Sequence, residues 1–315
     1  MEYRRLGAEE LLPPTVLCAI SFGTQRPARA VAAEYPGLAV HLDLPALLGA
    51  GTTELWHTDG RVTSGCDGIV HFASGGSFLA GKVEIDERAA GGLVGAAEAA
   101  YAAISRFTAH GTHPHLLRMY NYFSNINGGS GDAERYKRFC AGRAAGFAQL
   151  AAASWPAATA IGRQDDSGVL QVYWLAGSEP GRAIENPRQV SAFHYPRQYG
   201  PSPPNFSRAM LLSGGLLISG TASVLGHASH HADDLPAQLD EILRNLASVR
   251  QASGGAITQS GRGTLFKVYL RDAAAAGLVT RYLRAQLPAQ ASVIVLGADV
   301  CRRELLVEID AAHFG

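Results

Sequence analysis

The chain repeats itself, and this repeat constrains the fold more than any other feature of the sequence. Residues 72–81, FASGGSFLAG, resemble residues 211–220, LLSGGLLISG: each is a Ser-Gly-Gly turn followed by a short apolar strand that ends in glycine. Both copies continue into a segment with apolar residues at helical spacing, over residues 93–107 and 235–251. Such a repeat indicates two structurally similar units in one chain.

The later segments of the two copies also follow in the same order. A predicted strand, a predicted helix and a closing pair of strands correspond over residues 116–127 and 265–272, 134–152 and 275–287, and 158–177 and 292–311. In this alignment Gly162 matches Gly297 and Val172 matches Val307. We therefore predict an α+β protein with two β-β-α-β-α-β-type units, each a mixed β-sheet with helices packed on one face.

The length of 315 residues also suits two domains better than one. We predict a divergent N-terminal domain over residues 1–185, with about 55 extra residues at its start, and a C-terminal domain over residues 186–315. A stretch rich in Pro, Arg and Tyr, roughly residues 178–204, joins the two copies.

Charge and hydropathy exclude several classes of partner. Lys and Arg number 27 and so do Asp and Glu, so no excess of positive charge predicts a nucleic acid or an anionic membrane as partner. No apolar run approaches the ~20 residues of a membrane helix, and the start MEYRR is too polar for a secretory signal. We expect a cytoplasmic protein. The four cysteines form no CxxC pair, which argues against structural zinc and disulfides.

The last strand carries an unusual carboxylate. Residues 304–310 alternate as in a strand, so Glu308 shares a face with Leu306, and Cys301 lies seven residues before Glu308. In the first copy the repeat alignment puts Tyr173 in the place of Glu308 and Asp166 in that of Cys301. This difference favours one active copy and one supporting copy. A strand glutamate that simply faces solvent, and an inert buried cysteine, are the alternatives.

Known cofactor motifs are missing, and we expect neither a cofactor nor a metal. The sequence has no Walker spacing, no G-x-G-x-x-G between a strand and a helix, and no G-x-S-x-G. Residues 226–234, GHASHHADD, contain His and Asp at spacings that zinc or iron accepts. The simpler interpretation is that Asp233 or Asp234 caps a helix that begins near Leu235.

Two resemblances follow from these segments. Residues 203–311, with SRAMLLSGGLLISG, VYLRD and LLVEIDA, resemble the RidA/YjgF family, whose last strand ends on a functional glutamate. Over nearly the whole chain, LLRMYNYFSNIN, ERYKRFCAGR, NPRQVSAFHYPRQYGP and SGTASVLGHASHH together resemble the chorismatases, enzymes built from two RidA-like halves that remove the enolpyruvyl group of chorismate as pyruvate.

The chorismatase resemblance implies roles for Glu308 and Cys301. Glu308 would protonate the enolpyruvyl methylene, which requires a raised pKa; apolar neighbours raise it and nearby arginines lower it. In the aromatising branch of the family a cysteine stands seven residues before the glutamate, as Cys301 does here. The resemblance thus implies 3-hydroxybenzoate and pyruvate as products, with or without some 4-hydroxybenzoate, through an arene-oxide-like intermediate.

Alternatives to this function remain at this stage. One is a hydrolytic chorismatase that gives a dihydroxycyclohexadiene carboxylate and pyruvate. The other is a RidA-like protein that hydrolyses imines or binds small carboxylates. RidA-like units usually form trimers, so two fused copies are compatible with either a monomer or a homotrimer.

A dianionic substrate would need arginines, which bind carboxylates bidentately. Arg135 and Arg143 are eight residues apart, about 80° around a helix, and Arg197 lies in the stretch that joins the copies. We predict these three residues and Tyr195 as substrate-binding. The alternatives are that the arginines pair with acids such as Asp132 and that the tyrosine is a core residue.

Overall fold

The computed structural model describes residues 1–6, 12–24, 35–148, 155–255 and 261–314. Both copies of the repeat fold in the order β-β-α-β-α-β-β. The first copy consists of β7 (Val70–Gly75), β8 (Phe78–Asp86), α1 (Leu93–Ala109), β9 (His115–Ser124), α2 (Arg135–Gly146), β10 (Ala157–Arg163) and β11 (Val169–Gly177). The second consists of β13 (Ala209–Leu212), β14 (Gly215–Thr221), α3 (Leu235–Ala252), β17 (Thr264–Leu270), α4 (Ala276–Gln286), β18 (Ser292–Gly297) and β19 (Val307–Phe314). The helix predicted over 134–152 ends earlier, and its residues 149–152 lie outside the described residues.

The two copies build sheets with the same strand order. The first sheet runs β10-β9-β11-β8-β7-β6, with β6 (Thr63–Asp67) at its edge. The second runs β12-β13-β14-β19-β17-β18-β4, with β12 (Arg182–Ile184) and β4 (Ala46–Leu48) at its edges. In each copy one pair is parallel, β10 with β9 and β18 with β17, and the others are antiparallel. The predicted fold class is confirmed; the division at residue 185 stays a prediction.

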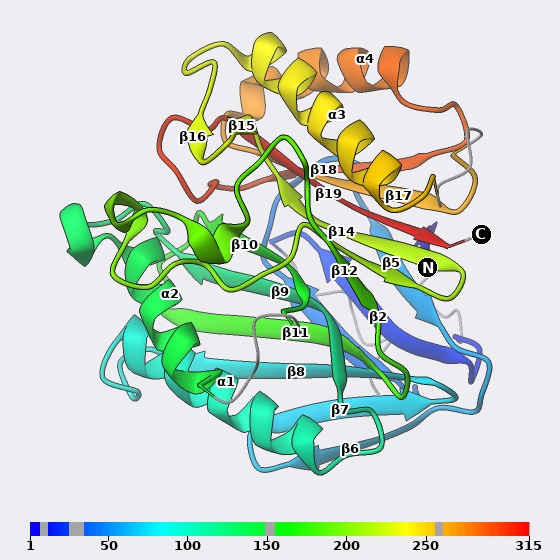
Figure 1. Cartoon of the computed structure of the whole chain (residues 1–315). Coiled ribbons are helices and arrows are strands. Elements are labelled where there is room, and N and C mark those ends of the chain that lie inside the picture. The colour runs from blue at the N-terminus through cyan, green and yellow to red at the C-terminus, as the bar shows by residue number, and fades with distance from the viewer. Residues whose placement is uncertain (7–11, 25–34, 149–154, 256–260, 315) are drawn as a thin grey trace.

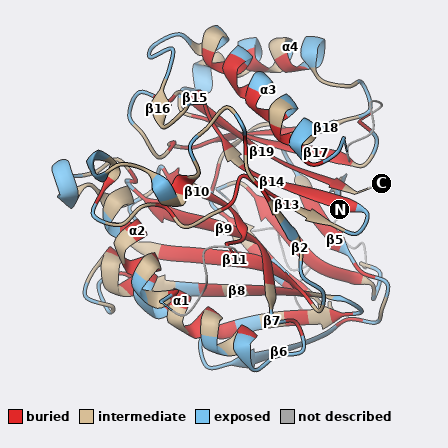
Figure 2. Cartoon of the chain, in the orientation of Figure 1, coloured by how far each residue is buried: buried red, intermediate tan, exposed pale blue. Residues whose placement is uncertain are grey.

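Helices cover the outer face of each sheet, α1 and α2 on the first and α3 and α4 on the second (Figure 1). Their apolar residues recur at helical spacing, and Leu239, Ile242 and Val249 of α3 pack with apolar residues of the second sheet. Figure 2 shows buried positions along these helices in red. Asp234 caps α3 by accepting a hydrogen bond from the backbone N–H of Ala237 at 3.0 Å, so the predicted capping role is confirmed.

The extra N-terminal residues form a third sheet that covers the inner faces of the other two. Its order is β1 (Glu2–Arg5), β5 (Thr52–His57), β2 (Val16–Phe22) and β3 (Leu38–Leu42). The largest cluster of buried hydrophobic residues draws on all three sheets, with Trp56 from the N-terminal sheet, Tyr120 and Tyr173 from the first copy, and Tyr269 and Leu296 from the second. The two copies are therefore packed about one common core.

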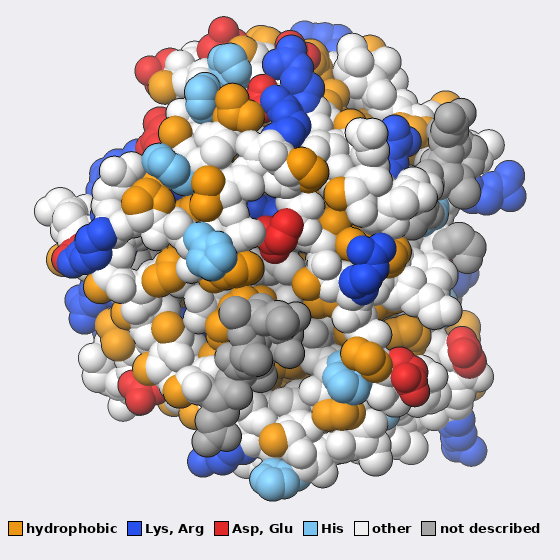
Figure 3. Space-filling view, in the orientation of Figure 1, with side chains coloured by type: hydrophobic (Ala, Val, Ile, Leu, Met, Phe, Trp, Pro, Cys, Tyr) orange, Lys and Arg blue, Asp and Glu red, His pale blue; other side chains and the backbone are white. Residues whose placement is uncertain are grey.

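The remaining described elements are short. They are η1 (Gly131–Ala133), η3 (Ala192–His194), η4 (Arg197–Tyr199), β15 (Val224–Leu225), β16 (Ala228–Ser229) and η5 (Ala273–Ala275). Basic and acidic side chains are interspersed over the face seen in Figure 3, in keeping with the zero net charge. No helix within the described ranges is long and apolar enough to cross a membrane.

The strand register corrects one detail of the repeat alignment. Gly162 pairs with Phe123 and Gly297 with Leu270, so the preceding residues, Tyr122 and Tyr269, are equivalent. Tyr122 lies opposite Gln171, whereas Tyr269 lies opposite Glu308. Gln171, not Tyr173, therefore occupies the place of Glu308.

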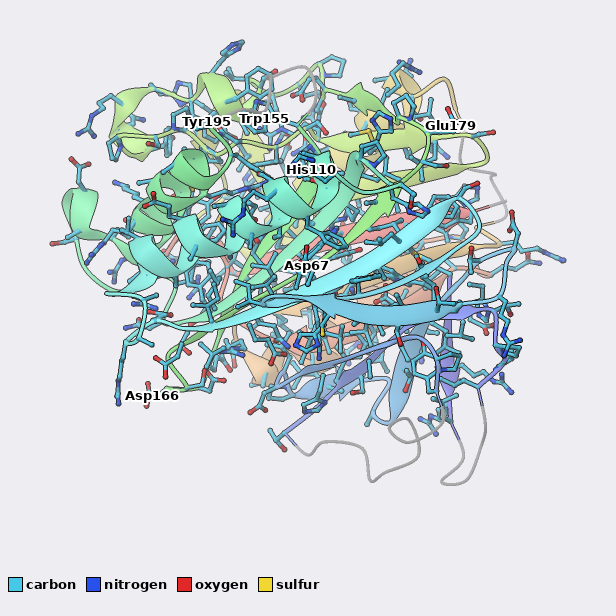
Figure 4. The ribbon with its side chains drawn as sticks, turned by 90° about the horizontal axis from the view of Figure 1, so that it is seen from below. Asp67, His110, Trp155, Asp166, Glu179 and Tyr195 are labelled. Atoms are coloured by element: carbon cyan, nitrogen blue, oxygen red, sulfur yellow. The ribbon has the colours of Figure 1, made fainter. Side chains whose placement is uncertain are left out.

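The physical reason is a longer connection in the second copy. Between Gly297 and Glu308 the chain has two residues more than between Gly162 and Gln171. An alignment without a gap shifts everything after the insertion by two positions. Cys301 lies seven residues before Glu308, and seven residues before Gln171 is Gln164, so the predicted equivalence of Asp166 with Cys301 fails as well. Asp166 lies well away from Tyr195 (Figure 4).

Candidate active site

A cavity of about 250 Å³ lies between the two copies. It forms where β10, an edge strand of the first sheet, meets the second copy: Gly162 and Asp299 exchange backbone hydrogen bonds of 2.8 and 2.9 Å, and Ser207 donates to Pro156 at 3.1 Å. The segment that connects the copies, residues 185–208, supplies a further wall. Polar and charged residues of the lining include Tyr136, Lys137, Arg143, Thr159, Tyr195, Tyr199, Arg208, Cys301, Arg302 and Glu308.

Glu308 is a buried carboxyl that faces this cavity. It lies on β19 and only 4% of its surface is exposed. No hydrogen bond joins its carboxyl to any residue that the structure describes. Burial is the main cause that raises the pKa of Glu308 to about 8, and the negative charge of Asp310 adds to it. A protonated carboxyl near neutral pH, without an internal partner, can donate its proton to a bound molecule.

Two buried guanidinium groups face the same cavity. Arg143, in the last turn of α2, is 3% exposed and packs over the rings of Tyr101 and Phe147, at 5.0 and 5.5 Å. Within the described part of the chain its Nε and Nη2 atoms have no hydrogen-bond partner. Burying a cation whose N–H donors have no acceptor costs free energy unless an anion binds to it. Arg143 can therefore bind a carboxylate.

Arg208 is the second of these guanidinium groups. Its Nη2 atom donates to the hydroxyl of Tyr195 at 2.7 Å and to the carbonyl of Val190 at 2.9 Å. Its Nε atom is buried and lacks a partner among the described residues. The two hydrogen bonds of Nη2 orient the guanidinium, and the Nε–H group can donate a hydrogen bond to a ligand.

Arg302 holds two aromatic residues of the connecting segment in place. Its guanidinium lies 4.1 Å from the ring centre of Tyr199 and 5.4 Å from that of Tyr195. Its Nη1 atom donates to the carbonyl of His227 and to the hydroxyl of Ser229, both at 3.0 Å. These contacts fix the connecting segment against the loop that carries Cys301.

Cys301 lies in that loop, residues 298–306, which Arg271 clamps from behind. Arg271 donates to the carbonyls of Val300, Arg302 and Leu305, each at 3.1 Å, and pairs with Asp299 at 2.8 Å. Burial, followed by the charge of Glu308, raises the pKa of the Cys301 thiol well above its ordinary value. Cys301 is therefore a neutral thiol near neutral pH, suited to shaping the cavity.

Comparison with known proteins identifies the family. The family model described as "Chorismatase FkbO/Hyg5-like, N-terminal" matches residues 54–176. The 3-hydroxybenzoate synthase of Streptomyces hygroscopicus is 36% identical over 88% of this chain and 85% of its own length. The chain belongs to the chorismatase family.

Other chorismatases support this membership. A chorismatase of Streptomyces rapamycinicus is 34% identical over 98% of this chain and 96% of its own length. The crystal structure of a chorismatase superposes with a TM-score of 0.87 at 32% identity, covering 99% of this chain and 97% of the other. The predicted resemblance to chorismatases is confirmed.

Four of the six predicted site residues of this chorismatase-family chain line the cavity: Glu308, Cys301, Arg143 and Tyr195. Arg135 and Arg197 are not among the lining residues. Arg135 reaches away to Glu87, bonding both carboxylate oxygens at 2.8 Å. Arg197 forms a bidentate pair with Asp132 at 2.8 and 2.6 Å on the surface, the surface pairing that the sequence left open.

Sequence reasoning missed Arg208, Arg302, Thr159 and Gly220, which also line the cavity. Arg208 stands directly before the Ser-Gly-Gly hairpin, and Arg302 directly follows Cys301. No spacing rule singles out either arginine. The available sign that these two arginines belong to the site was their position in the sequence next to the predicted hairpin and next to Cys301.

The histidines of residues 226–234 take structural positions. The backbone carbonyl of His227 accepts a hydrogen bond from Arg302, and Nδ1 of His227 lies 3.4 Å from the hydroxyl of Tyr199. Among the described residues, no group of three or more His, Cys, Asp or Glu side chains is arranged to hold a metal ion.

Proposed function

We propose that this protein converts chorismate to 3-hydroxybenzoate and pyruvate, with or without some 4-hydroxybenzoate. One observation carries the proposal: a buried carboxyl that favours its protonated form, Glu308, shares a small cavity with two buried guanidinium groups, Arg143 and Arg208, that form no ion pair with any described residue. A dianion that accepts a proton on carbon fits this arrangement. The names of the relatives, 3-hydroxybenzoate synthase and chorismatase, support the same substrate.

The two carboxylates of chorismate would bind to different arginines. Arg143 comes from α2 of the first copy, and Arg208 from the connecting segment before β13. The substrate would therefore bridge the copies. Tyr195, which accepts a hydrogen bond from Arg208, would hold that guanidinium in its binding orientation.

Glu308 would start the reaction by donating its proton to the terminal methylene carbon of the enolpyruvyl group. The resulting oxocarbenium ion is stabilised by the carboxylate that Glu308 becomes. The C–O bond to the ring then breaks and pyruvate leaves, while the neighbouring ring hydroxyl oxygen closes on the ring carbon and returns its proton to Glu308. The arene-oxide-like intermediate opens and loses its ring hydrogen to give hydroxybenzoate, so no water is consumed.

Cys301 would decide which product forms. As a neutral thiol beside Glu308 it occupies space in which a water molecule could otherwise attack the oxocarbenium carbon. We propose that this exclusion directs the reaction to hydroxybenzoate instead of the dihydroxy acid.

Incubation of the purified protein with chorismate tests the proposal. Products are separated by liquid chromatography against 3-hydroxybenzoate, 4-hydroxybenzoate and the dihydroxycyclohexadiene carboxylate, and pyruvate is assayed in parallel. Hydroxybenzoate with equimolar pyruvate from the wild type, and none from Glu308→Gln, is the expected result. The dihydroxy acid as main product would replace the aromatising assignment by the hydrolytic one.

No turnover of chorismate would overturn the proposed function, and an imine-release assay would then test a RidA-like activity. A cytoplasmic location and the choice between monomer and homotrimer stay predictions. If a single chain forms the complete active site, dilution of the enzyme leaves the specific activity unchanged.

A further inference from the structure

A second set of charged side chains lies behind the cavity, and the reaction described above does not use it. Arg118 of β9 is fully buried, and Asp310 of β19 is 2% exposed. Neither lines the cavity. Buried charges are costly, so a pair that the fold needs only for packing could be replaced by apolar residues. Its position next to Glu308 suggests a use.

Three partners converge on one carboxylate oxygen of Asp310. Its Oδ2 atom pairs with Nη2 of Arg118 at 3.2 Å, and it accepts hydrogen bonds from the hydroxyls of Tyr269 at 3.0 Å and Thr159 at 3.1 Å. Arg118 comes from the first copy and Asp310 from the second, so the pair crosses the interface between the copies.

Thr159 connects this pair to the wall of the cavity. Its hydroxyl accepts from Nη2 of Arg118 at 2.5 Å and from the backbone N–H of Gly220 at 3.0 Å while it donates to Asp310. Thr159 and Gly220 both line the cavity. The carboxyl of Glu308 lies against Gly220 on the cavity side. One polar layer therefore separates the Arg118–Asp310 pair from Glu308.

Glu308 and Asp310 lie on the same face of β19, two residues apart, which is roughly 6.6 Å along a strand. Two carboxylates on neighbouring positions of one buried strand face repel each other, so the pair favours a state with one proton. The proton goes to the carboxyl with fewer partners. Asp310 has Arg118 and two hydroxyl donors, whereas Glu308 has no hydrogen-bond partner among the described residues.

We propose that Asp310, paired with Arg118, is a positioning residue that keeps the proton of this carboxyl pair on Glu308. The inference rests on the proposed role of Glu308 as the general acid, but it concerns the free enzyme and can be tested without turnover. Asp310 touches no substrate in this assignment; it acts through Glu308.

The other groups that face Glu308 do not provide this effect. Arg208 and Arg302 lie across the cavity and, like Arg118, favour the ionised form of Glu308. Cys301 and Tyr136 are neutral near neutral pH, because burial raises the pKa of each well above its ordinary value.

Tyr269, opposite Glu308 in the sheet, is likewise neutral for the same reason. Glu134 and Glu304 also line the cavity but are not among the main causes that shift the pKa of Glu308. Among those causes, Asp310 is the negative charge that opposes the three arginines. It stands second after burial among the causes that raise the pKa of Glu308.

The first test is the pH dependence of the ¹³C carboxyl signals in the native enzyme labelled at Asp and Glu. Glu308→Gln identifies the signal of Glu308, and Asp310→Asn that of Asp310. In the wild type the Glu308 signal is expected to titrate near pH 8 while the Asp310 signal stays that of a carboxylate. Titration of Asp310 instead of Glu308 would overturn the inference, whether or not the enzyme turns over chorismate.

The second test compares Asp310→Asn with Glu54→Gln. Glu54 is also buried, 2% exposed and paired with Lys267 at 2.7 Å, but it is not among the main causes that shift the pKa of Glu308. In Asp310→Asn the midpoint of Glu308, and the falling alkaline limb of kcat/KM, should move down by about one pH unit or more. In Glu54→Gln neither should move, even if both variants lose thermal stability.

An unchanged alkaline limb in folded Asp310→Asn would reduce Asp310 to a structural role and contradict the proposal. If Asp310→Asn does not fold, the titration of the labelled wild type still decides. Absence of chorismate turnover in every variant, with the expected carboxyl titrations, would reject the proposed function and leave this inference standing.

Discussion

The carboxyl of Glu308 lies against the α-carbon of Gly220, in the space that the β-carbon of any other residue at position 220 would occupy. Glu308 is on β19 and Gly220 on the neighbouring strand β14, where the register between the two strands shifts. The irregular pairing and the missing side chain together let the carboxyl lie between the strand and the cavity. The position of the general acid thus depends on a glycine.

Gly220→Ala is expected to displace the Glu308 carboxyl and to lower kcat/KM for chorismate by about 100-fold or more, because a shift of about 1 Å in a reacting group has that effect. Steady-state kinetics of pyruvate release measure it. Gly277→Ala is the matched control: Gly277 lies in α4, where an added β-carbon meets open space apart from the flexible end of Arg281. Equal activity of the two variants would contradict the steric account.

Glu308→Gln is expected to make the protein more stable at alkaline pH than the wild type. The pKa of Glu308 is about 8 in the folded protein and about 4.5 when unperturbed. Between these values the folded state binds more protons than the unfolded state, so the free energy of unfolding falls as the pH rises. Glutamine removes this dependence, which is on the order of a few kcal/mol.

Denaturant unfolding of both proteins near pH 5.5 and pH 8 measures this difference. The stability advantage of Glu308→Gln should be small at the lower pH and larger at the higher pH. The same advantage at both values would show that Glu308 is ionised in the folded state throughout this range.

Arg143→Lys is expected to weaken chorismate binding by about 10- to 100-fold, because it keeps the charge but loses the planar pair of donors. The dissociation constant is measured by calorimetry in the inactive Glu308→Gln background. Arg197→Gln serves as control and should change the constant little, since its pair with Asp132 is exposed. A larger loss in Arg197→Gln than in Arg143→Lys would return Arg197 to the binding site.

Thiol alkylation should distinguish the cysteines. Cys66 is exposed on β6, Cys18 and Cys140 are buried, and burial raises the pKa of Cys301. Iodoacetamide near neutral pH is therefore expected to modify Cys66 first, because it reacts with thiolates, while Cys301 stays unmodified on the same time scale. Peptide mass spectrometry locates the label. Rapid modification of Cys301 would indicate a reactive thiolate and a chemical role.

Cys301→Ala tests the product-directing role. Pyruvate release should continue, because Glu308 performs the protonation, but the dihydroxy acid should increase relative to hydroxybenzoate as water enters the vacated space. Chromatography of the products measures the ratio, and Cys66→Ser is the control. An unchanged ratio would show that the loop backbone, not the thiol, sets the outcome.

Local patterns were sufficient for the elements. The Ser-Gly-Gly hairpins, the helical spacing of Leu239, Ile242 and Val249, and the cap at Asp234 depend on neighbours within a few residues, so they can be seen in the sequence. Strand alternation placed Glu308 on a definite face, and the resemblance to the chorismatases singled it out as functional. The two-copy organisation followed from the repeat itself.

Contacts between distant segments decided the rest. Arg208, not Arg135 or Arg197, lines the cavity together with Arg143, because the fold places α2 and the connecting segment around the same cavity, an arrangement that no spacing encodes. The equivalence of Gln171 with Glu308 required the strand register, since an insertion in the loop of Cys301 is invisible to an ungapped alignment.

The sequence by itself determined that this chain has two similar α+β units and a carboxylate set among apolar residues on its last strand. Only the tertiary structure determined how that carboxylate is controlled. Arg118 and Asp310 are 192 positions apart in the sequence yet lie 3.2 Å from each other behind Glu308. Electrostatic interactions act through distance in space and through burial, and the packing of the two copies around one core sets both.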